Sequence, residues 1–152
     1  MDLTEPKVMG ILNVTPDSFS DGGKFSSVEN ATKHALQMIN EGVHIIDVGG
    51  YSTRPGADTV SIDEELSRVI PIIESLKNVT DIPISIDTFR SKVAKEAILS
   101  GAAMVNDVSA GDDDENMIQI VAKLKVPYIA MHKKGIPKSM QENIQYNNVV
   151  EE

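Results

Sequence analysis

The chain has 152 residues, of which 41% are hydrophobic and 24% charged, and this composition predicts one globular domain. Its 14 Lys and Arg against 23 Asp and Glu give a net charge of −9, which argues against the basic surface that nucleic acids or anionic membranes require. The charge leaves room for a small anionic substrate, because backbone dipoles or a metal ion hold anions locally. The absence of cysteine excludes thiolate catalysis and cysteine metal sites, and it fits a reducing cytosol. Neither a signal peptide nor a membrane helix is expected from the sequence.

Five short apolar runs, rich in Ile and Val, predict buried parallel strands. They are Val8–Val14, Val43–Val48, Ile82–Thr88, Ala102–Val108 and Val126–Met131.

The gaps between these runs carry the apolar periodicity of helices. Ser26 with Glu29, and Ser61 with Glu64, have the spacing of capping boxes, so we expect the first two helices to begin there.

Other signals predict where the helices end. Gly42 and Gly101 are expected to close the first and third helices. Pro71 is expected to kink the second helix or end it early. The acidic run at 112–115 precedes the fourth helical pattern, and we interpret it as a cap and a solvated face.

The alternation of strands and helices predicts a parallel sheet with right-handed crossovers. Five such units are compatible with an open doubly wound sheet or with part of an eight-stranded barrel. Periodicity alone does not decide between these two α/β folds.

Polar residues follow each apolar run at the point where the predicted strand ends. They are Asn13, Asp47, Asp87, Asn106 and His132. Because ligands bind at the carboxyl ends of parallel strands in both candidate folds, we interpret this edge as a binding site. A structural role is favoured over a catalytic one for His132. Asp107 follows Asn106 and so points to the other side of its strand, where we expect it to bond to backbone groups.

Two loops beside this edge have a composition that suits an anion. Residues 13–23 read NVTPDSFSDGG, and residues 49–57 read GGYSTRPGA. Hydroxyls and an arginine among glycine amides favour phosphate. Neither loop is a P-loop or a dinucleotide-binding fingerprint.

These stretches together resemble dihydropteroate synthase, the folate-pathway transferase that is the target of sulfonamides. The resemblance is carried by GILNVTPDSFSDGG (residues 10–23), DVGGYSTRPGA (47–57), SIDTFRS (85–91), NDVSAG (106–111) and YIAMH (128–132). It implies a TIM (β/α)8 barrel. It also implies the condensation of dihydropterin diphosphate with para-aminobenzoate to give dihydropteroate and diphosphate, with Mg2+ as cofactor.

The resemblance also implies roles for individual residues. Asn13 corresponds to the family's Mg2+-binding asparagine, and Asp87 and Asn106 to the pair that binds the pterin edge. Asp47, Asp87 and Arg54 correspond to the catalytic groups. The other implied substrate-binding residues are the apolar walls Val108 and Met131, and the loop residues Asp17, Phe19, Asp21, Thr53, Arg54 and Pro55. An aspartate accepts two donors and an asparagine offers one donor and one acceptor, which suits a pterin.

Only the first five βα units of the family are matched, so we expect residues 1–152 to be a C-terminally truncated pterin-binding domain. The helices through which the family usually forms a homodimer have no counterpart here. One alternative is a catalytically silent half-barrel that associates with other chains through its open edges. Another is a pterin-binding domain like that of methyltetrahydrofolate-dependent methyltransferases, which have no need of a loop for diphosphate.

Overall fold

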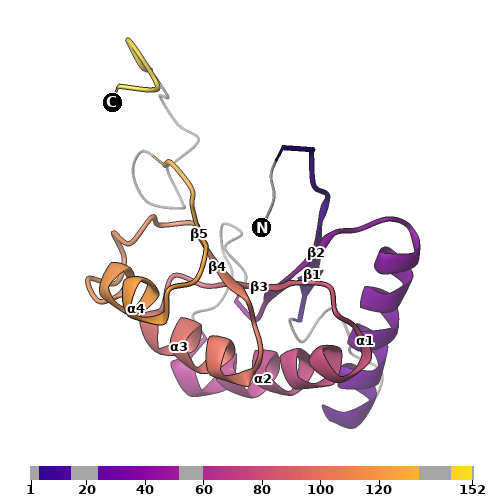
Figure 1. Cartoon of the computed structure of the whole chain (residues 1–152). Helices are drawn as coiled ribbons and strands as arrows, with labels where there is room; N and C mark the ends of the chain where they lie inside the picture. The colour runs from indigo at the N-terminus through magenta and orange to yellow at the C-terminus, as the bar shows by residue number, and fades with distance from the viewer. Residues whose placement is uncertain (1–3, 15–23, 52–59, 134–144, 152) are drawn as a thin grey trace.

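The computed structural model describes residues 4–14, 24–51, 60–133 and 145–151. It confirms the predicted alternation of strands and helices (Figure 1). The elements are β1 (Met9–Asn13), α1 (Lys24–Asn40), β2 (Ile45–Gly49), α2 (Ile62–Val79), β3 (Ile84–Asp87), α3 (Ser91–Ser100), β4 (Met104–Asp107), α4 (Met117–Leu124) and β5 (Tyr128–Ala130).

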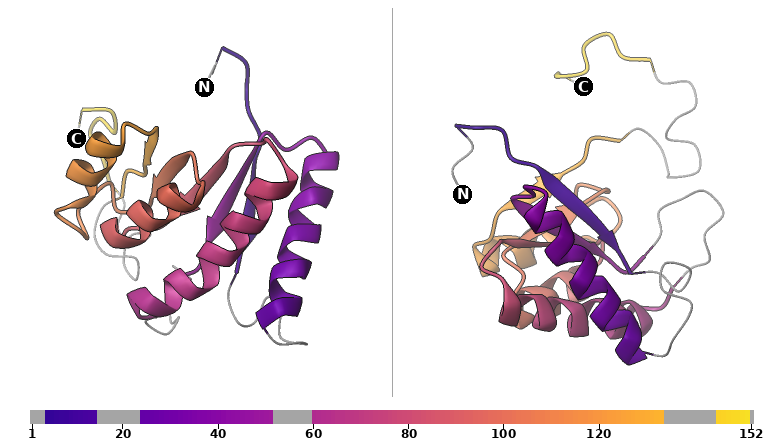
Figure 2. Two further views of the ribbon diagram at one scale, coloured as in Figure 1. Left: turned by 60° about the horizontal axis from the view of Figure 1, so that its bottom comes forward. Right: turned by 90° about the vertical axis from the view of Figure 1, so that its right-hand side faces the viewer.

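The five strands form one parallel sheet in the order β1-β2-β3-β4-β5, so each new strand is added beside the one before it. The four helices lie next to one another on a single side of this sheet (Figure 2). A doubly wound sheet reverses its strand order and carries helices on both faces, whereas a barrel winds in one direction. The structure therefore selects the barrel alternative, with five consecutive βα units.

The hydrophobic core lies between the sheet and the helices, and strand alternation assigns each residue to one face. The core includes Leu12, Ile46, Val48, Ile86 and Val105 from the strands, with Ala35, Val69, Ile73, Leu76, Val93 and Met117 from the helices. The residues between these positions in the strands point the other way. We call that side the open face; it carries Ile11, Asn13, Asp47, Asp87 and Asn106, and none of the described helices packs on it.

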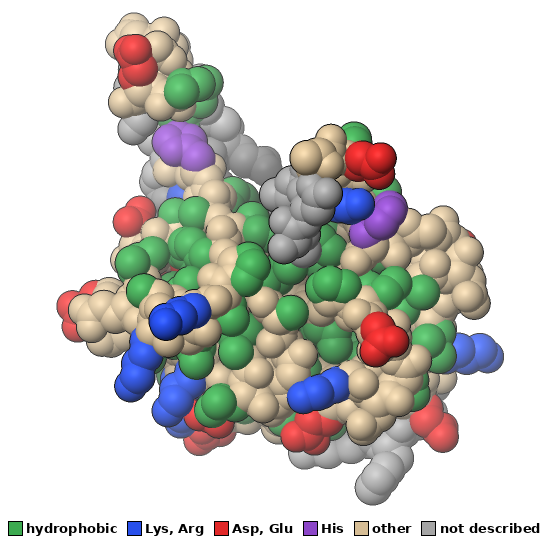
Figure 3. All heavy atoms as spheres, viewed as in Figure 1, with side chains coloured by type: hydrophobic (Ala, Val, Ile, Leu, Met, Phe, Trp, Pro, Cys, Tyr) green, Lys and Arg blue, Asp and Glu red, His purple; other side chains and the backbone are tan. Residues whose placement is uncertain are grey.

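Apolar side chains remain accessible on the open face. Ile11 is 63% exposed and Ile129 is 39% exposed. Hydrophobic side chains gather across the middle of the view in Figure 3, whereas charged ones lie mainly toward its rim and over the helices. None of the helices in the described ranges is both long and apolar enough to span a bilayer.

The two predicted capping boxes have different outcomes. The second is confirmed, because the Ser61 hydroxyl accepts a hydrogen bond from the backbone N–H of Glu64 at 3.1 Å. The first is wrong, because α1 begins at Lys24 and Ser26 is already inside it. The S-x-x-E spacing is also the i, i+3 spacing within any helix, so the pattern alone does not mark a start.

The predicted ends of the first three helices have different outcomes as well. Gly42 follows α1 with φ +104°, and Gly101 caps α3 with φ +124°, as expected for glycine in a left-handed terminus. The early end predicted at Pro71 is wrong, since α2 continues to Val79. Pro71 lies on the exposed side of α2, where water can bond to the carbonyl that loses its helical partner. Packing of the buried side of α2 against the core maintains the helix on both sides of Pro71.

Candidate active site

Four of the predicted site residues lie at the carboxyl ends of adjacent strands. In the register of the sheet, Asn13 is opposite Gly49, Gly49 is opposite Asp87, and Asp87 is opposite Asn106. These positions form one row across β1 to β4, and alternation turns their side chains to the open face. Residues that are 93 positions apart in the sequence are thus aligned by the parallel register.

Gly49 leaves the space that the row needs. A Cβ atom at this position would lie 3.3 Å from Asp87 Oδ2 and 3.4 Å from Asn13 Oδ1. The carboxylate of Asp87 and the amide oxygen of Asn13 therefore approach each other across the bare backbone of β2. Two oxygen atoms directed at one place form an environment that suits a cation or a ligand rich in N–H donors.

Asp47 lies one pleat below this row on β2 and is 3% exposed. Its Oδ2 accepts a hydrogen bond of 2.9 Å from the side-chain amide of Asn106. Its Oδ1 and the hydroxyl oxygen of the fully buried Ser85, its register partner on β3, complete no hydrogen bond among the described residues. Buried polar atoms are normally paired. Asp47 Oδ1 and the Ser85 hydroxyl are therefore exceptions to this rule within the described part of the chain.

The electrostatics of the row follow from two carboxylates on one sheet face. Burial, together with the negative charges of Asp47, Glu65 and Asp107, raises the pKa of Asp87 to about 7. Burial also raises the pKa of Asp47, while the hydrogen bond from the Asn106 amide favours its charged form and opposes the shift. Near neutral pH, both the protonated and the charged form of Asp87 are therefore populated. A cationic or donor-rich ligand would bring its pKa back toward the ordinary value.

The remaining predicted residues divide into two groups. Val108 is half-buried in the turn that follows β4, and Met131 lies beside β4, with its backbone N–H donating to the backbone carbonyl of Asp107 at 3.0 Å. The predicted loop residues Asp17, Phe19, Asp21, Thr53, Arg54 and Pro55 lie outside the described residues. His132 is exposed, and its Nε2 lies 3.1 Å from the hydroxyl of Tyr146.

The row also bears on the expected Mg2+, which binds oxygen ligands. No group of three His, Cys, Asp or Glu side chains among the described residues forms a metal cluster. Mg2+ bound with a diphosphate substrate needs only one or two protein oxygens, because phosphate and water complete its shell. The amide oxygen of Asn13, beside Asp87 across Gly49, meets that requirement. The residues present therefore fit the ion.

Sequence reasoning missed Ser85. The signal was available, because this residue precedes Asp87 by two positions in a strand and therefore shares its face. A hydroxyl within an otherwise apolar buried run also needs a partner.

A parallel sheet wound in one direction, with acceptor groups aligned at its carboxyl edge, defines a small-molecule site of the TIM-barrel class. The chain belongs to the pterin binding enzyme family, whose model it matches over residues 9–152.

Known relatives narrow this assignment. The chain is 52% identical over 145 residues to the dihydropteroate synthase of Synechocystis sp., covering 95% of this chain and 50% of that protein. The structure of Xanthomonas albilineans dihydropteroate synthase with 4-aminobenzoic acid has a TM-score of 0.86 and 46% identity, covering 99% of this chain and 53% of that one. The Yersinia pestis dihydropteroate synthase in complex with a sulfonamide drug has a TM-score of 0.86 and 43% identity, covering 99% and 55%. The chain thus spans about half the length of these relatives.

Proposed function

We propose that this chain supplies the pterin-binding and metal-binding side of a dihydropteroate synthase. In this reaction 6-hydroxymethyl-7,8-dihydropterin diphosphate and para-aminobenzoate give 7,8-dihydropteroate and diphosphate. The row formed by Asn13, Asp87 and Asn106 across β1 to β4 is the observation that carries the proposal. The 4-aminobenzoic acid in the Xanthomonas albilineans enzyme and the sulfonamide in the Yersinia pestis enzyme support it.

Asp87 and Asn106 match the hydrogen-bonding edge of a pterin. The ring N–H and the exocyclic amine are adjacent donors, and a carboxylate accepts both. Asn106 offers an acceptor and a donor, and its bond to Asp47 at 2.9 Å fixes its orientation. Pairing with two donors favours the charged form of Asp87, whose pKa is about 7 without a ligand.

The chemical step breaks the bond between the methylene carbon and the diphosphate oxygen. The electron pair leaves with the diphosphate, and the methylene carbon becomes electron-deficient. Asp47 and Asp87 place negative charge on the open face, where it stabilises this cationic carbon. The amine nitrogen of para-aminobenzoate then forms the new C–N bond and loses a proton to solvent or a nearby carboxylate.

Asn13 would hold Mg2+ against the diphosphate, and the bound ion would supply neutralising charge to the leaving group. Arg54, which lies outside the described residues, is expected to add a second positive charge. We place the reaction in the cytosol because both substrates are small polar molecules and a chain without cysteine needs no oxidising compartment.

The test combines binding with turnover. The chain is incubated with dihydropterin diphosphate, Mg2+ and labelled para-aminobenzoate, and labelled dihydropteroate is sought. Calorimetry with the pterin substrate alone measures binding separately. Asp87→Ala is the site variant, and Asp81→Ala, an exposed carboxylate just before the same strand, is the matched control. Pterin binding lost only in Asp87→Ala supports the site, and equal binding by both variants would refute it.

Turnover then distinguishes a catalytically active chain from a silent half-barrel. Product formation shows that these five βα units suffice or that chains complement one another. Pterin binding without product corresponds to the silent half-barrel.

A further inference from the structure

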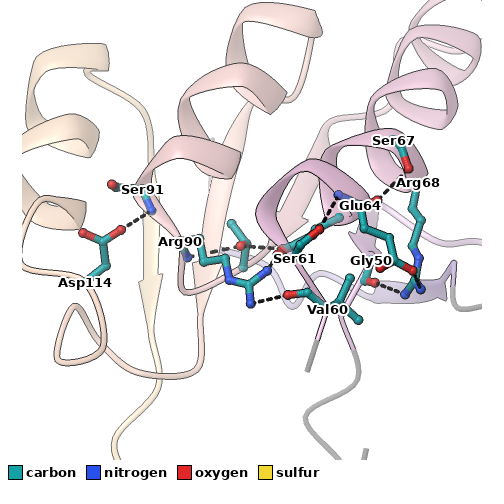
Figure 4. A network of polar contacts seen from close by, with 11 residues as sticks. Gly50, Val60, Ser61, Glu64, Ser67, Arg68, Arg90, Ser91 and Asp114 are labelled. Carbon is teal, nitrogen blue, oxygen red and sulfur yellow. Dashed lines mark hydrogen bonds and ion pairs between the residues drawn. The ribbon is translucent and has the colours of Figure 1, made fainter. Parts of the chain in front are cut away.

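The junction between β3 and α3 is held in place by hydrogen bonds to distant segments. The backbone N–H of Thr88 donates to the carbonyl of Asn106 at 3.0 Å, which ties the end of β3 to β4 beside the row. The guanidinium of Arg90 donates to the carbonyl of Val60, just before α2, at 2.6 Å (Figure 4). The residues that follow Asp87 are therefore fixed from two sides.

The side chain of Thr88 is buried on the helix side of the sheet, where it joins a closed network. Its hydroxyl donates to Glu65 Oε1 at 2.7 Å and accepts a hydrogen bond of 3.2 Å from the backbone N–H of Arg90. Glu65 is fully buried on α2, and its other oxygen accepts a hydrogen bond of 2.7 Å from Arg90 Nη1. The network thus connects α2 to the end of β3 and balances the buried charge of Glu65.

Asp87 has no comparable support of its own, because no described residue donates a hydrogen bond to its carboxylate. Asp87 and Thr88 share one peptide group, and their side chains point to opposite faces of the sheet. The N–H of this peptide group is the one that donates to the Asn106 carbonyl. The placement of Asp87 relative to Asn106 therefore depends on the bonds that Thr88 makes.

We propose that Thr88 and Glu65 are positioning residues for the pterin, which act through Asp87 and Asn106 and do not touch the ligand. The assignment of the ligand rests on the proposed function. Hydrogen bonds weaken steeply as their geometry departs from the ideal, so a small displacement of Asp87 lowers affinity although both binding groups remain. Apolar residues of similar volume often stabilise a fold at least as well as a buried ion pair does. The buried pair of Glu65 and Arg90 is therefore better explained by the orientation that it gives Thr88.

Thr88→Val is the main test, because valine keeps the shape of threonine and removes the hydroxyl. Thr88→Ser restores the hydroxyl and is the conservative rescue. Thr32→Val is the matched control, because the same substitution there removes one partner of the 2.9 Å hydrogen bond between Thr32 and Ser75, which joins α1 to α2 away from the row. Glu65→Met with Arg90→Met removes the acceptor of Thr88 without leaving a lone buried charge, and it replaces Thr88→Val if that variant does not fold.

Two readouts are compared. Hydrogen exchange at the Thr88 amide reports its bond to Asn106 and needs no ligand. We expect it to be about tenfold faster in Thr88→Val, while exchange at Val105, whose N–H is bonded to the Pro127 carbonyl, stays unchanged. The Kd for the pterin substrate, measured by calorimetry, is expected to rise about tenfold in the same variant. Thr88→Ser and Thr32→Val are expected to match wild type in both measurements.

Unchanged exchange at the Thr88 amide overturns the proposal whatever the affinity. Faster exchange with a wild-type Kd also overturns it, because the network would then have only a structural role. An equal rise in Kd in Thr32→Val, or a rise that Thr88→Ser does not reverse, overturns it as well, because the hydroxyl would not be the cause. A wild-type chain that binds no pterin refutes the proposed function, and the ligand assignment falls with it. Hydrogen exchange then still decides whether the Thr88 hydroxyl couples β3 to β4.

Discussion

Both faces of the sheet carry carboxylates, but the two faces differ in how many hydrogen-bond donors they offer to these groups. On the helix side, Asp107 is fully buried and accepts four hydrogen bonds. The donors are the Ser109 N–H and hydroxyl at 2.7 and 2.8 Å, the Gly111 N–H at 2.9 Å and the Tyr128 hydroxyl at 2.7 Å. Burial and this bond raise the pKa of Tyr128 well above its ordinary value, which keeps it a donor. The expectation that Asp107 bonds to backbone groups is confirmed.

On the open face, Asp47 accepts one hydrogen bond, and Asp87 accepts none from the described residues. Asp47, 3% exposed, is nearly as buried as Asp107, whereas Asp87 is half-buried, so burial alone does not separate the two kinds of carboxylate. The number of hydrogen-bond donors separates them. A saturated carboxylate such as Asp107 holds neighbouring segments together, and an unsaturated one such as Asp87 is available to a ligand.

Asp107→Ala is expected to have the largest effect, and on stability. It leaves the donors of Ser109, Gly111 and Tyr128 without partners, at a cost of about 3–5 kcal/mol in the free energy of unfolding. Urea unfolding measures it. Asp112→Ala, an exposed neighbour, is the control, and its cost is expected to stay within about 0.5 kcal/mol. Equal small costs in the two variants would contradict the structural role of Asp107.

Asp87→Ala is expected to act on binding instead. Loss of two hydrogen bonds to a charged acceptor weakens pterin binding by about 100-fold or more. The free energy of unfolding is not expected to fall, because no described donor loses a partner and a carboxylate that is costly to ionise is removed. Calorimetry and urea unfolding on the same sample check both parts. A stability loss as large as that of Asp107→Ala would remove the contrast between the faces.

The pH dependence of stability sharpens the same contrast. The pKa of Asp87 is raised from 3.8 to about 7 on folding, so between these values the folded chain binds more protons than the unfolded chain. Its contribution is complete below pH 3.8 and is lost as pH rises to 7, on the order of 4 kcal/mol. Asp87→Asn removes this term. Unfolding by urea at pH 5 and pH 8 is therefore expected to show a smaller loss of stability in the variant than in the wild type, and equal losses would contradict the shift.

Gly49→Ala tests the close approach within the row. The added methyl group would lie 3.3 Å from Asp87 Oδ2 and 3.4 Å from Asn13 Oδ1, which forces one side chain aside. We expect pterin binding to weaken by about tenfold, corresponding to about 1.4 kcal/mol. Asn13→Ala with Gly49→Ala relieves part of the crowding, so titrations of the single and double variants separate crowding of Asp87 from other causes.

The smallest effect is expected from the apolar part of the open face. Ile11 is 63% exposed, and β1 and β5 are the edges of the sheet in the described part of the chain. We expect weak, concentration-dependent self-association that Ile11→Glu reduces. Sedimentation velocity over a range of concentrations measures it. A clean monomer at the highest concentration would exclude this use of the face.

Much of the site was predictable from sequence because each strand ends in a polar residue. Asn13, Asp47, Asp87 and Asn106 were placed at one edge on that basis, and the parallel register aligns three of them in one row. Ser85 and the contacts of Arg90 were not predictable in this way. They depend on which side chains from distant segments remain without a partner and which find one.

The sequence by itself determined the parallel strands, the helices between them and the polar edge, because periodicity and caps act over a few residues. Only the tertiary structure decided three further points. It selected a sheet wound in one direction, it continued α2 past Pro71, and it gave the buried Asp107 four donors while leaving Asp87 with none among the described residues. The physical reason is the same in each case. Packing and hydrogen-bond pairing between segments far apart in the chain carry free energies that outweigh the local preferences of a single stretch.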